Sequence, residues 1–207
     1  MQALRRANKA EVEMKLGIRT RVRRTVRALA RTDNWVSSAL TLPVGQISIG
    51  EARALGKLVA EITEPGPIVE VGTLFGWSTR VMVLFKQPDR ELITVDNYGW
   101  NPLSLPARVH ERSTSEALAE AVRQYNVRIV NQDKADFFRT YAGPAPALVF
   151  LDAIHSYEET RKDIEWAKAA GAKVVCLHDY SPQHPGVMQA VDEAGGPGKL
   201  FETLAVL

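Results

Sequence analysis

The chain has 207 residues, of which 45% are hydrophobic, and a formal net charge of +2 at neutral pH. This length suits one domain with a well-buried core, and no run approaches the roughly 20 apolar residues that a membrane-spanning helix needs. The N-terminus also lacks the apolar core of a secretory signal, so we expect a single cytoplasmic domain without a membrane span. The chain has one cysteine, Cys176, which excludes an intrachain disulfide. Because Cys176 lies in the apolar run 173–177, we expect a buried, inert thiol.

The first segment differs in charge from the rest of the chain. Residues 1–31 hold ten Lys and Arg against two Asp and Glu, a balance of +8, which leaves −6 for residues 32–207. We expect residues 1–45 to form a basic helical arm or cap that packs on its own domain or on a second copy, which makes a homodimer plausible. The alternative is an arm that binds nucleic acid or an acidic partner. Nucleic acid is disfavoured because no aromatic residues are interleaved among the basic residues of 1–31 for base stacking.

Strands and helices alternate after the arm. Ser48 and Glu51 mark the start of an amphipathic helix that ends before Glu64-Pro65-Gly66-Pro67. The pattern then predicts strands at 68–72, 91–96, 127–131, 147–152, 173–177 and 200–206, with helices at 76–86, 114–125, 134–141, 157–170 and 185–194. This rotation is typical of an α/β fold, with a mostly parallel, doubly wound sheet covered by helices on both faces. Ligands of such sheets bind at the carboxyl ends of the strands.

A glycine turn follows the first strand. Gly72 and Gly76 separate the apolar run 68–71 from a helix start, and glycine permits close approach of a ligand to the backbone. The spacing Glu-x-Gly-x-x-x-Gly departs from the dinucleotide fingerprint Gly-x-Gly-x-x-Gly. A ligand other than a pyrophosphate is therefore favoured.

Polar residues gather where the other strands end. An acid follows an apolar run at five strands, and any one of these acids taken alone reads equally well as a helix cap. Taken together they favour a site at one edge of the sheet, made of Glu70, Asp96, Asn131-Gln132-Asp133, Asp152 with His155, and His178-Asp179.

These segments resemble class I S-adenosylmethionine-dependent methyltransferases, in particular methyltransferase family 24, with its catechol O-methyltransferase-like and macrolide-sugar O-methyltransferase-like members. The resemblance covers residues 46–207 and implies a Rossmann-like sheet of about seven strands with the last antiparallel. Residues 70–78 look like the motif that admits the methionine portion of the cofactor. Asp96 looks like the acid that accepts hydrogen bonds from both ribose hydroxyls, and residues 131–133 look like the segment at the adenine edge. The implied cofactor contacts are Glu70, Gly72, Thr73, Gly76, Trp77, Ser78, Asp96, Asn97, Gln132, Asp133 and Asp152.

The same resemblance implies a metal site and a base. In the related metal-dependent enzymes, the positions of Asp152, His178 and Asp179 hold Mg²⁺, and the position of His155 is the general base. The cation would chelate the acceptor hydroxyl, and histidine, which titrates near neutrality, would remove its proton. His178 departs from the oxygen ligands of these relatives. Either it stays outside the coordination sphere, or the site favours Mn²⁺, Fe²⁺ or Zn²⁺, or no metal binds and His178 orients Asp179 or the substrate.

The predicted function is an O-methyltransferase acting on a hydroxyl of a small molecule, a sugar or a phenol. Selectivity for the acceptor is expected before residue 50 and in the loop 97–113. Two alternatives stay open, a relative resembling cephalosporin hydroxylases and a non-catalytic scaffold that uses the basic arm.

Overall fold

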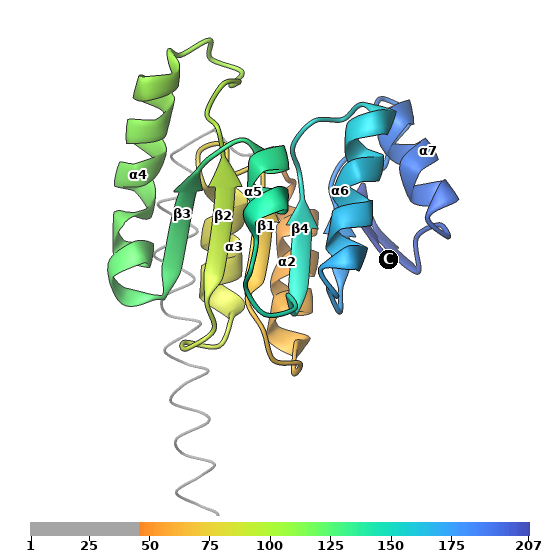
Figure 1. The fold of residues 1–207 in the computed structure, drawn as a ribbon, viewed down its shortest axis with the longest axis horizontal. Coiled ribbons are helices and arrows are strands. Elements are labelled where there is room, and N and C mark those ends of the chain that lie inside the picture. Colours follow the sequence, from red (N-terminus) through yellow and green to blue (C-terminus); the bar gives the residue numbers. More distant parts are fainter. Residues whose placement is uncertain (1–45) are drawn as a thin grey trace, which may run out of the picture. The chain divides into compact units, whose positions relative to one another are not determined.

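The computed structural model describes residues 46–207. The basic helical arm expected at residues 1–45 lies outside the described residues, and so does any contact that it makes. The described part holds one seven-stranded sheet with helices on both faces, as predicted (Figure 1).

The sheet has the strand order β3-β2-β1-β4-β5-β7-β6. The first five strands in this order are parallel, and β7 runs antiparallel to both β5 and β6. The chain moves outward in one direction from β1 and in the other from β4, so the strand order reverses between these two strands. Ligands of doubly wound sheets bind beside such a point. The strands are β1 Ile68–Val71, β2 Leu92–Asp96, β3 Val127–Asn131, β4 Leu148–Leu151, β5 Val175–Leu177, β6 Lys199–Phe201 and β7 Leu204–Val206.

Three helices pack on each face of the sheet. One layer contains α2 (Ile49–Glu61), α3 (Trp77–Phe85) and α4 (Ala107–Gln124). The other contains α5 (Lys134–Thr140), α6 (Tyr157–Ala169) and α7 (Pro185–Glu193). Figure 1 shows this second layer in front of the strands.

Alternation along β1 explains how one strand serves both layers. Ile68 packs in the cluster under α2 and α3, whereas Val69 and Val71 pack in the cluster under α5, α6 and α7. Successive side chains of a strand point to opposite faces, so a strand covered on both sides is mostly apolar. Glu70 is the polar exception in β1. Cys176 is fully buried in the first cluster, as predicted for a small core residue.

The structure corrects two predicted boundaries. The helix predicted at 114–125 begins at Ala107, because the inner face of its first turns is made by polar residues that hydrophobic periodicity does not detect. His110 and Thr114 are fully buried there and both contact the carbonyl oxygen of Leu74. The strand predicted at 200–206 is a hairpin of two strands, broken at Glu202, whose φ is 56°.

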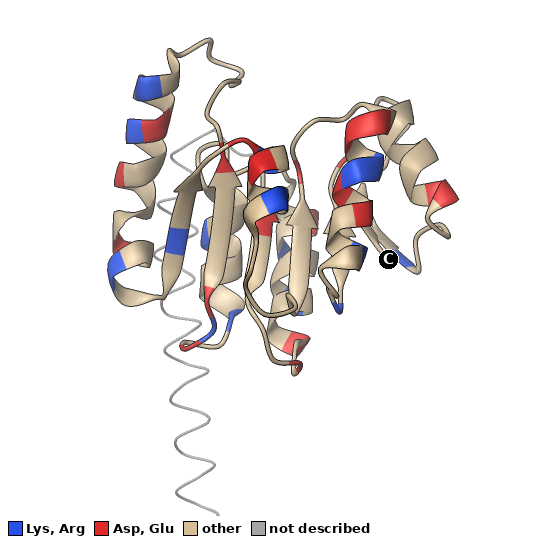
Figure 2. Ribbon diagram, in the orientation of Figure 1, with Lys and Arg blue, Asp and Glu red and all other residues tan. Residues whose placement is uncertain are grey.

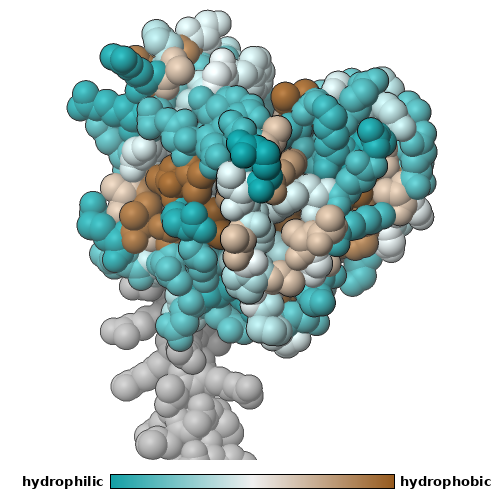
Figure 3. All heavy atoms as spheres, in the orientation of Figure 1, coloured by the Kyte–Doolittle hydropathy of each residue, from teal (hydrophilic) through white to brown (hydrophobic). Residues whose placement is uncertain are grey.

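The visible surface is mostly hydrophilic, and a hydrophobic patch on it lies over β2 and β3 beside α5 (Figure 3). Acidic residues mark the carboxyl ends of β2 and β4 (Figure 2). In residues 46–207, no helix has the length and apolar character needed to cross a membrane.

Candidate active site

The turn between β1 and α3 depends on two glycines. Gly72 has a φ of 100°, and a Cβ placed there would lie 1.9 Å from the carbonyl oxygen of Asp152. Gly76 is the N-cap of α3 with a φ of 80°, and its Cβ would meet the side chain of Leu118 at 2.8 Å. Glycine at position 72 thus allows the ends of β1 and β4 to approach each other closely at the reversal of strand order.

Asp96 holds this turn in place from the end of β2. Its Oδ2 accepts hydrogen bonds from the backbone N–H groups of Thr73 at 3.0 Å and Leu74 at 2.9 Å. Its Oδ1 accepts one from the N–H of Tyr98 at 2.7 Å. A carboxylate offers about four acceptor sites, so one remains for a ligand. Asp96 therefore shapes the turn as well as lining the space beside it.

Glu70 lies inside the fold, beneath the turn. Its side chain is fully buried and accepts hydrogen bonds from the hydroxyls of Ser78, Thr79 and Thr94 at 2.5, 2.5 and 2.6 Å. Burial raises the pKa of Glu70 to about 7, although the three hydroxyls act in the opposite direction. In this position Glu70 links α3 to β1 and β2. It would affect a bound ligand only indirectly, by holding the turn in place.

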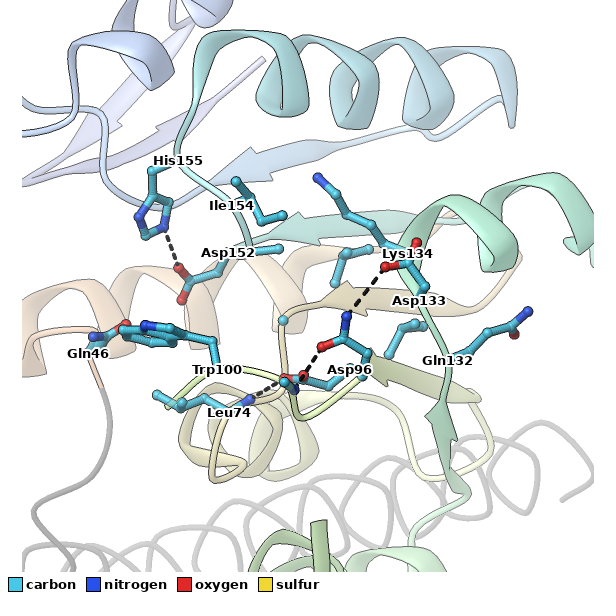
Figure 4. A pocket seen from close by; sticks show the side chains of 16 residues that line it. Gln46, Leu74, Asp96, Trp100, Gln132, Asp133, Lys134, Asp152, Ile154 and His155 are labelled. Atoms are coloured by element: carbon cyan, nitrogen blue, oxygen red, sulfur yellow. Dashed lines mark hydrogen bonds and ion pairs between the residues drawn. The ribbon is translucent and has the colours of Figure 1, made fainter. Parts of the chain in front are cut away.

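A hollow of about 440 Å³ lies at the carboxyl ends of β1, β2, β3 and β4 (Figure 4). Six of the predicted cofactor contacts line it, and three others line a small adjoining hollow that shares Gly72 and Asp152. Glu70 and Gly76 line neither. The six are Gly72, Asp96, Asn97, Gln132, Asp133 and Asp152, and the three are Thr73, Trp77 and Ser78.

Among the described residues that line the hollow, Lys134 is the one Lys or Arg. Its Nζ contacts both oxygens of Asp163, at 2.6 and 2.8 Å, and Glu159 at 3.2 Å. Asp163, on α6, is buried, and burial raises its pKa to about 6 despite the lysine. The positive charge of Lys134 is thus balanced by two carboxylates of α6.

Two acids and two histidines converge beside the hollow, after the ends of β4 and β5. Asp152 and His155 line the hollow, and His178 and Asp179 lie next to them. Nε2 of His155 lies 3.6 Å from Asp152 and 3.2 Å from Asp179. Nδ1 of His178 lies 3.3 Å from each of the same carboxylates. Figure 4 shows the ring of His155 directed at Asp152.

The acids and the histidines in this cluster stabilise each other's charged forms. Burial disfavours ionisation of Asp152, but the contacts with His155 and His178 bring its pKa down to about 2. Burial likewise opposes a charged His178, yet Asp152 and Asp179 raise the pKa of its ring to about 11. Without a cation, the two carboxylates therefore hold a proton on His178.

The donor set fits a divalent cation. Nε2 of His155 and Nδ1 of His178 are buried and form no well-directed hydrogen bond within the described part of the chain. Ligand atoms of Asp152, His178 and Asp179 all lie within 4.8 Å of one another. A cation here would replace the proton on His178, and two carboxylates with an imidazole suit Mn²⁺, Fe²⁺ or Zn²⁺ as well as Mg²⁺.

Sequence reasoning missed two residues of this neighbourhood. Glu51 contacts His178 at 3.3 Å from a position 127 residues earlier, and its only sequence signal was that of a helix cap. His184, at the N-cap of α7, lies 3.7 Å from Asp179, and its ring centroid is 4.6 Å from that of His155. Neither follows a parallel strand directly, so a search of strand ends does not find them.

A doubly wound sheet with a glycine turn after β1, an acid after β2 and a hollow between them defines a nucleotide- or cofactor-binding α/β protein. Residues 69–180, more than half of the chain, match the family described as Methyltransferase domain. The chain therefore belongs to this family of methyltransferases, as its motifs predicted. No curated protein matches the chain significantly.

Solved structures with the same fold include several enzymes. Cofactor-bound Rv0187 from MTB shares 23% identity, with 82% of this chain and 78% of that chain covered and a TM-score of 0.59. The O-methyltransferase TomG from Streptomyces achromogenes, in complex with SAM, shares 23% identity over 80% of this chain and 74% of that chain, with a TM-score of 0.54. An O-methyltransferase from Bacillus cereus, in complex with SAH, shares 16% identity over 87% and 88%, with a TM-score of 0.58.

Proposed function

We propose that this protein transfers a methyl group from S-adenosylmethionine to a hydroxyl of a small molecule, with a divalent cation at Asp152, His178 and Asp179 and with His155 as general base. The convergence of His155 on the two carboxylates, at the end of a hollow that begins at the glycine turn, carries this proposal. The bound SAM and SAH of the structural neighbours support the choice of cofactor.

The residues of the hollow would divide the binding of the cofactor. Gly72 leaves room for its methionine portion, and the remaining acceptor site of Asp96 would take a ribose hydroxyl. Asn97, Gln132 and Asp133 would face the adenine, since they follow β2 and β3 on the same side of the hollow. When bound, this cofactor supplies a methyl group on a sulfonium, which needs only a well-placed oxygen nucleophile.

Asp152, His178 and Asp179 would hold a cation that lowers the pKa of a coordinated hydroxyl. His155 would take the hydroxyl proton at Nε2, where the negative charges of Asp152 and Asp179 face the proton that the ring receives. Orientation and proton removal would then supply the catalysis.

The first test is calorimetric titration with S-adenosylmethionine and S-adenosylhomocysteine, with and without Mg²⁺ or Mn²⁺. We expect cofactor binding and additional heat with a cation. Absence of binding under every condition would contradict the proposal and favour the scaffold hypothesis.

The second test measures S-adenosylhomocysteine formation with a panel of phenols, catechols and sugars. We expect His155→Asn to lose at least a hundredfold in kcat with unchanged cofactor affinity, since general-base catalysis contributes roughly 10²–10⁴-fold. Asp136→Asn, at an exposed carboxylate on α5 that pairs with Arg139, is the matched control and should keep full activity. Equal kcat in wild type and His155→Asn would exclude the assigned base. A product that is hydroxylated rather than methylated would favour the hydroxylase alternative.

A further inference from the structure

Glu51 is a buried carboxylate with every acceptor site in use. It is 3% exposed, and carboxylates are rarely so buried unless they are paired. Oε1 accepts hydrogen bonds from the backbone N–H of Thr203, at 3.0 Å, and from the hydroxyl of the same residue. Oε2 accepts one from the N–H of Ser48 at 2.8 Å and lies 3.3 Å from Nε2 of His178. Four contacts therefore fix the position of this carboxylate.

A helix cap explains only part of this arrangement. Glu51 and Ser48 form a reciprocal capping box at the start of α2, which accounts for the contact with the N–H of Ser48. It does not account for the contact with His178, at the end of β5, or with Thr203, in the turn between β6 and β7. The carboxylate thus joins three elements that are distant in sequence.

The contact with Glu51 determines which nitrogen of His178 can bind a cation. An ionised carboxylate only accepts hydrogen bonds, so Nε2 of His178 must carry the hydrogen that points at Oε2. A neutral ring then has its lone pair on Nδ1, which faces Asp152 and Asp179 at 3.3 Å each. Within the described residues, Nδ1 is also the nitrogen of this ring that is buried without a well-directed hydrogen bond.

We propose that Glu51 is a positioning residue of the cation site: it holds the Nε2 hydrogen of His178 and so presents Nδ1 as a ligand beside Asp152 and Asp179. The proposal rests on the cation in the proposed function. Histidines that bind metals commonly donate their other ring hydrogen to a carboxylate, and loss of such a carboxylate typically weakens metal binding 10- to 100-fold. The start of α2 and the β6–β7 turn are thereby coupled to a site at the end of β4 and β5.

The test compares Glu51→Gln with the matched control Thr203→Val. Glu51→Gln removes the negative charge that faces Nε2 of His178, whichever way the amide turns, and so replaces a charge-assisted hydrogen bond by a weaker one or by none. Thr203→Val removes one hydroxyl from Glu51, keeps the backbone N–H, and leaves the contact with His178 in place. Calorimetric titration with Mn²⁺ and with Zn²⁺, in the presence of S-adenosylhomocysteine, gives the affinities. We expect Glu51→Gln to bind both ions at least tenfold more weakly, Thr203→Val to change by less than about threefold, and the affinity for S-adenosylhomocysteine to stay the same.

A spectroscopic measurement on the wild-type protein gives a second, independent readout. Long-range ¹⁵N–¹H correlation of the Zn²⁺-loaded protein reports which ring nitrogen of His178 carries hydrogen and which binds the ion. We expect hydrogen on Nε2 and coordination through Nδ1. Coordination through Nε2, or equal cation affinity in wild type and Glu51→Gln, would overturn the role of Glu51 and leave the proposed function standing. No cation binding to wild-type protein that does bind S-adenosylhomocysteine would overturn both the metal assistance and this inference.

Discussion

Substitution of Gly72 by alanine tests the geometry on which the hollow depends. The φ of 100° costs an L-residue about 1–3 kcal/mol. The new Cβ would also lie 1.9 Å from the carbonyl oxygen of Asp152, which must move by about 1.5 Å to reach an ordinary contact. That movement strains the hydrogen bond from the N–H of Asp152 to the oxygen of Val71, now 2.9 Å and worth about 1 kcal/mol. The sum is about 2–4 kcal/mol.

Gly195→Ala separates the two contributions. Gly195 has a φ of 120° and no heavy atom within 4 Å of the Cβ position, so alanine there meets only the backbone cost. We expect the melting temperature of Gly72→Ala to fall by about 10 °C and that of Gly195→Ala by a few degrees. Gly72→Ala should also bind S-adenosylhomocysteine at least tenfold more weakly in calorimetry, and Gly195→Ala should bind it normally. Equal melting temperatures in the two variants would show that close approach of β1 and β4 does not matter.

Three further predictions concern buried charges. Glu70→Gln removes a carboxyl whose pKa is raised from 4.5 to about 7. The folded wild type therefore binds this proton more tightly than the unfolded chain does, and its free energy of unfolding falls by about 3 kcal/mol as the pH rises through this range. The variant has no such proton and does not show this fall. The melting temperature of the variant relative to wild type should therefore rise between about pH 5 and about pH 8, and a constant difference would contradict the assignment. Asp96→Asn turns one acceptor of the glycine turn into a donor, so we expect about tenfold weaker binding of S-adenosylhomocysteine by calorimetry, and unchanged affinity would exclude Asp96 from the site. Lys134→Met leaves the carboxylate of Asp163, which is 3% exposed, without its cation, and should lower the free energy of unfolding in urea by about 3–5 kcal/mol. The double variant Lys134→Met/Asp163→Leu should recover most of this loss, and no recovery would disprove the pairing.

Local pattern was sufficient to predict most of the fold. Short, mostly apolar runs bounded by polar turns locate β1, β2, β4 and β5, because strands covered on both faces are mostly apolar. The glycines at 72 and 76 and the acids at 96, 152 and 179 follow directly from the ends of these runs. The parallel arrangement then brings such residues to one edge of the sheet, which is why His155, Asp152 and Asp179 lie close together in the structure.

Residues that act across long sequence separations were not predictable in this way. His110 and Thr114 are polar residues on the inner face of α4, so the hydrophobic period started too late. The break at Glu202 has no glycine or proline to mark it. Glu51 has the local signature of a helix cap, and its contact with His178 exists only because β5 and the β6–β7 hairpin fold against α2.

Asp152 connects the two parts of the candidate site. Its backbone carbonyl occupies the space that a side chain at position 72 would need, and its carboxylate faces His155 and His178. A shift of the carbonyl by about 1.5 Å cannot leave the carboxylate in place, because the two groups share one Cα on a short connection after β4. We therefore expect Gly72→Ala to weaken Mn²⁺ binding as well as cofactor binding, although no proposed ligand has been changed. If Mn²⁺ bound this variant as tightly as wild type while cofactor affinity fell, the glycine turn and the acid–histidine cluster would be independent, and the close contact of β1 with β4 would serve the cofactor alone.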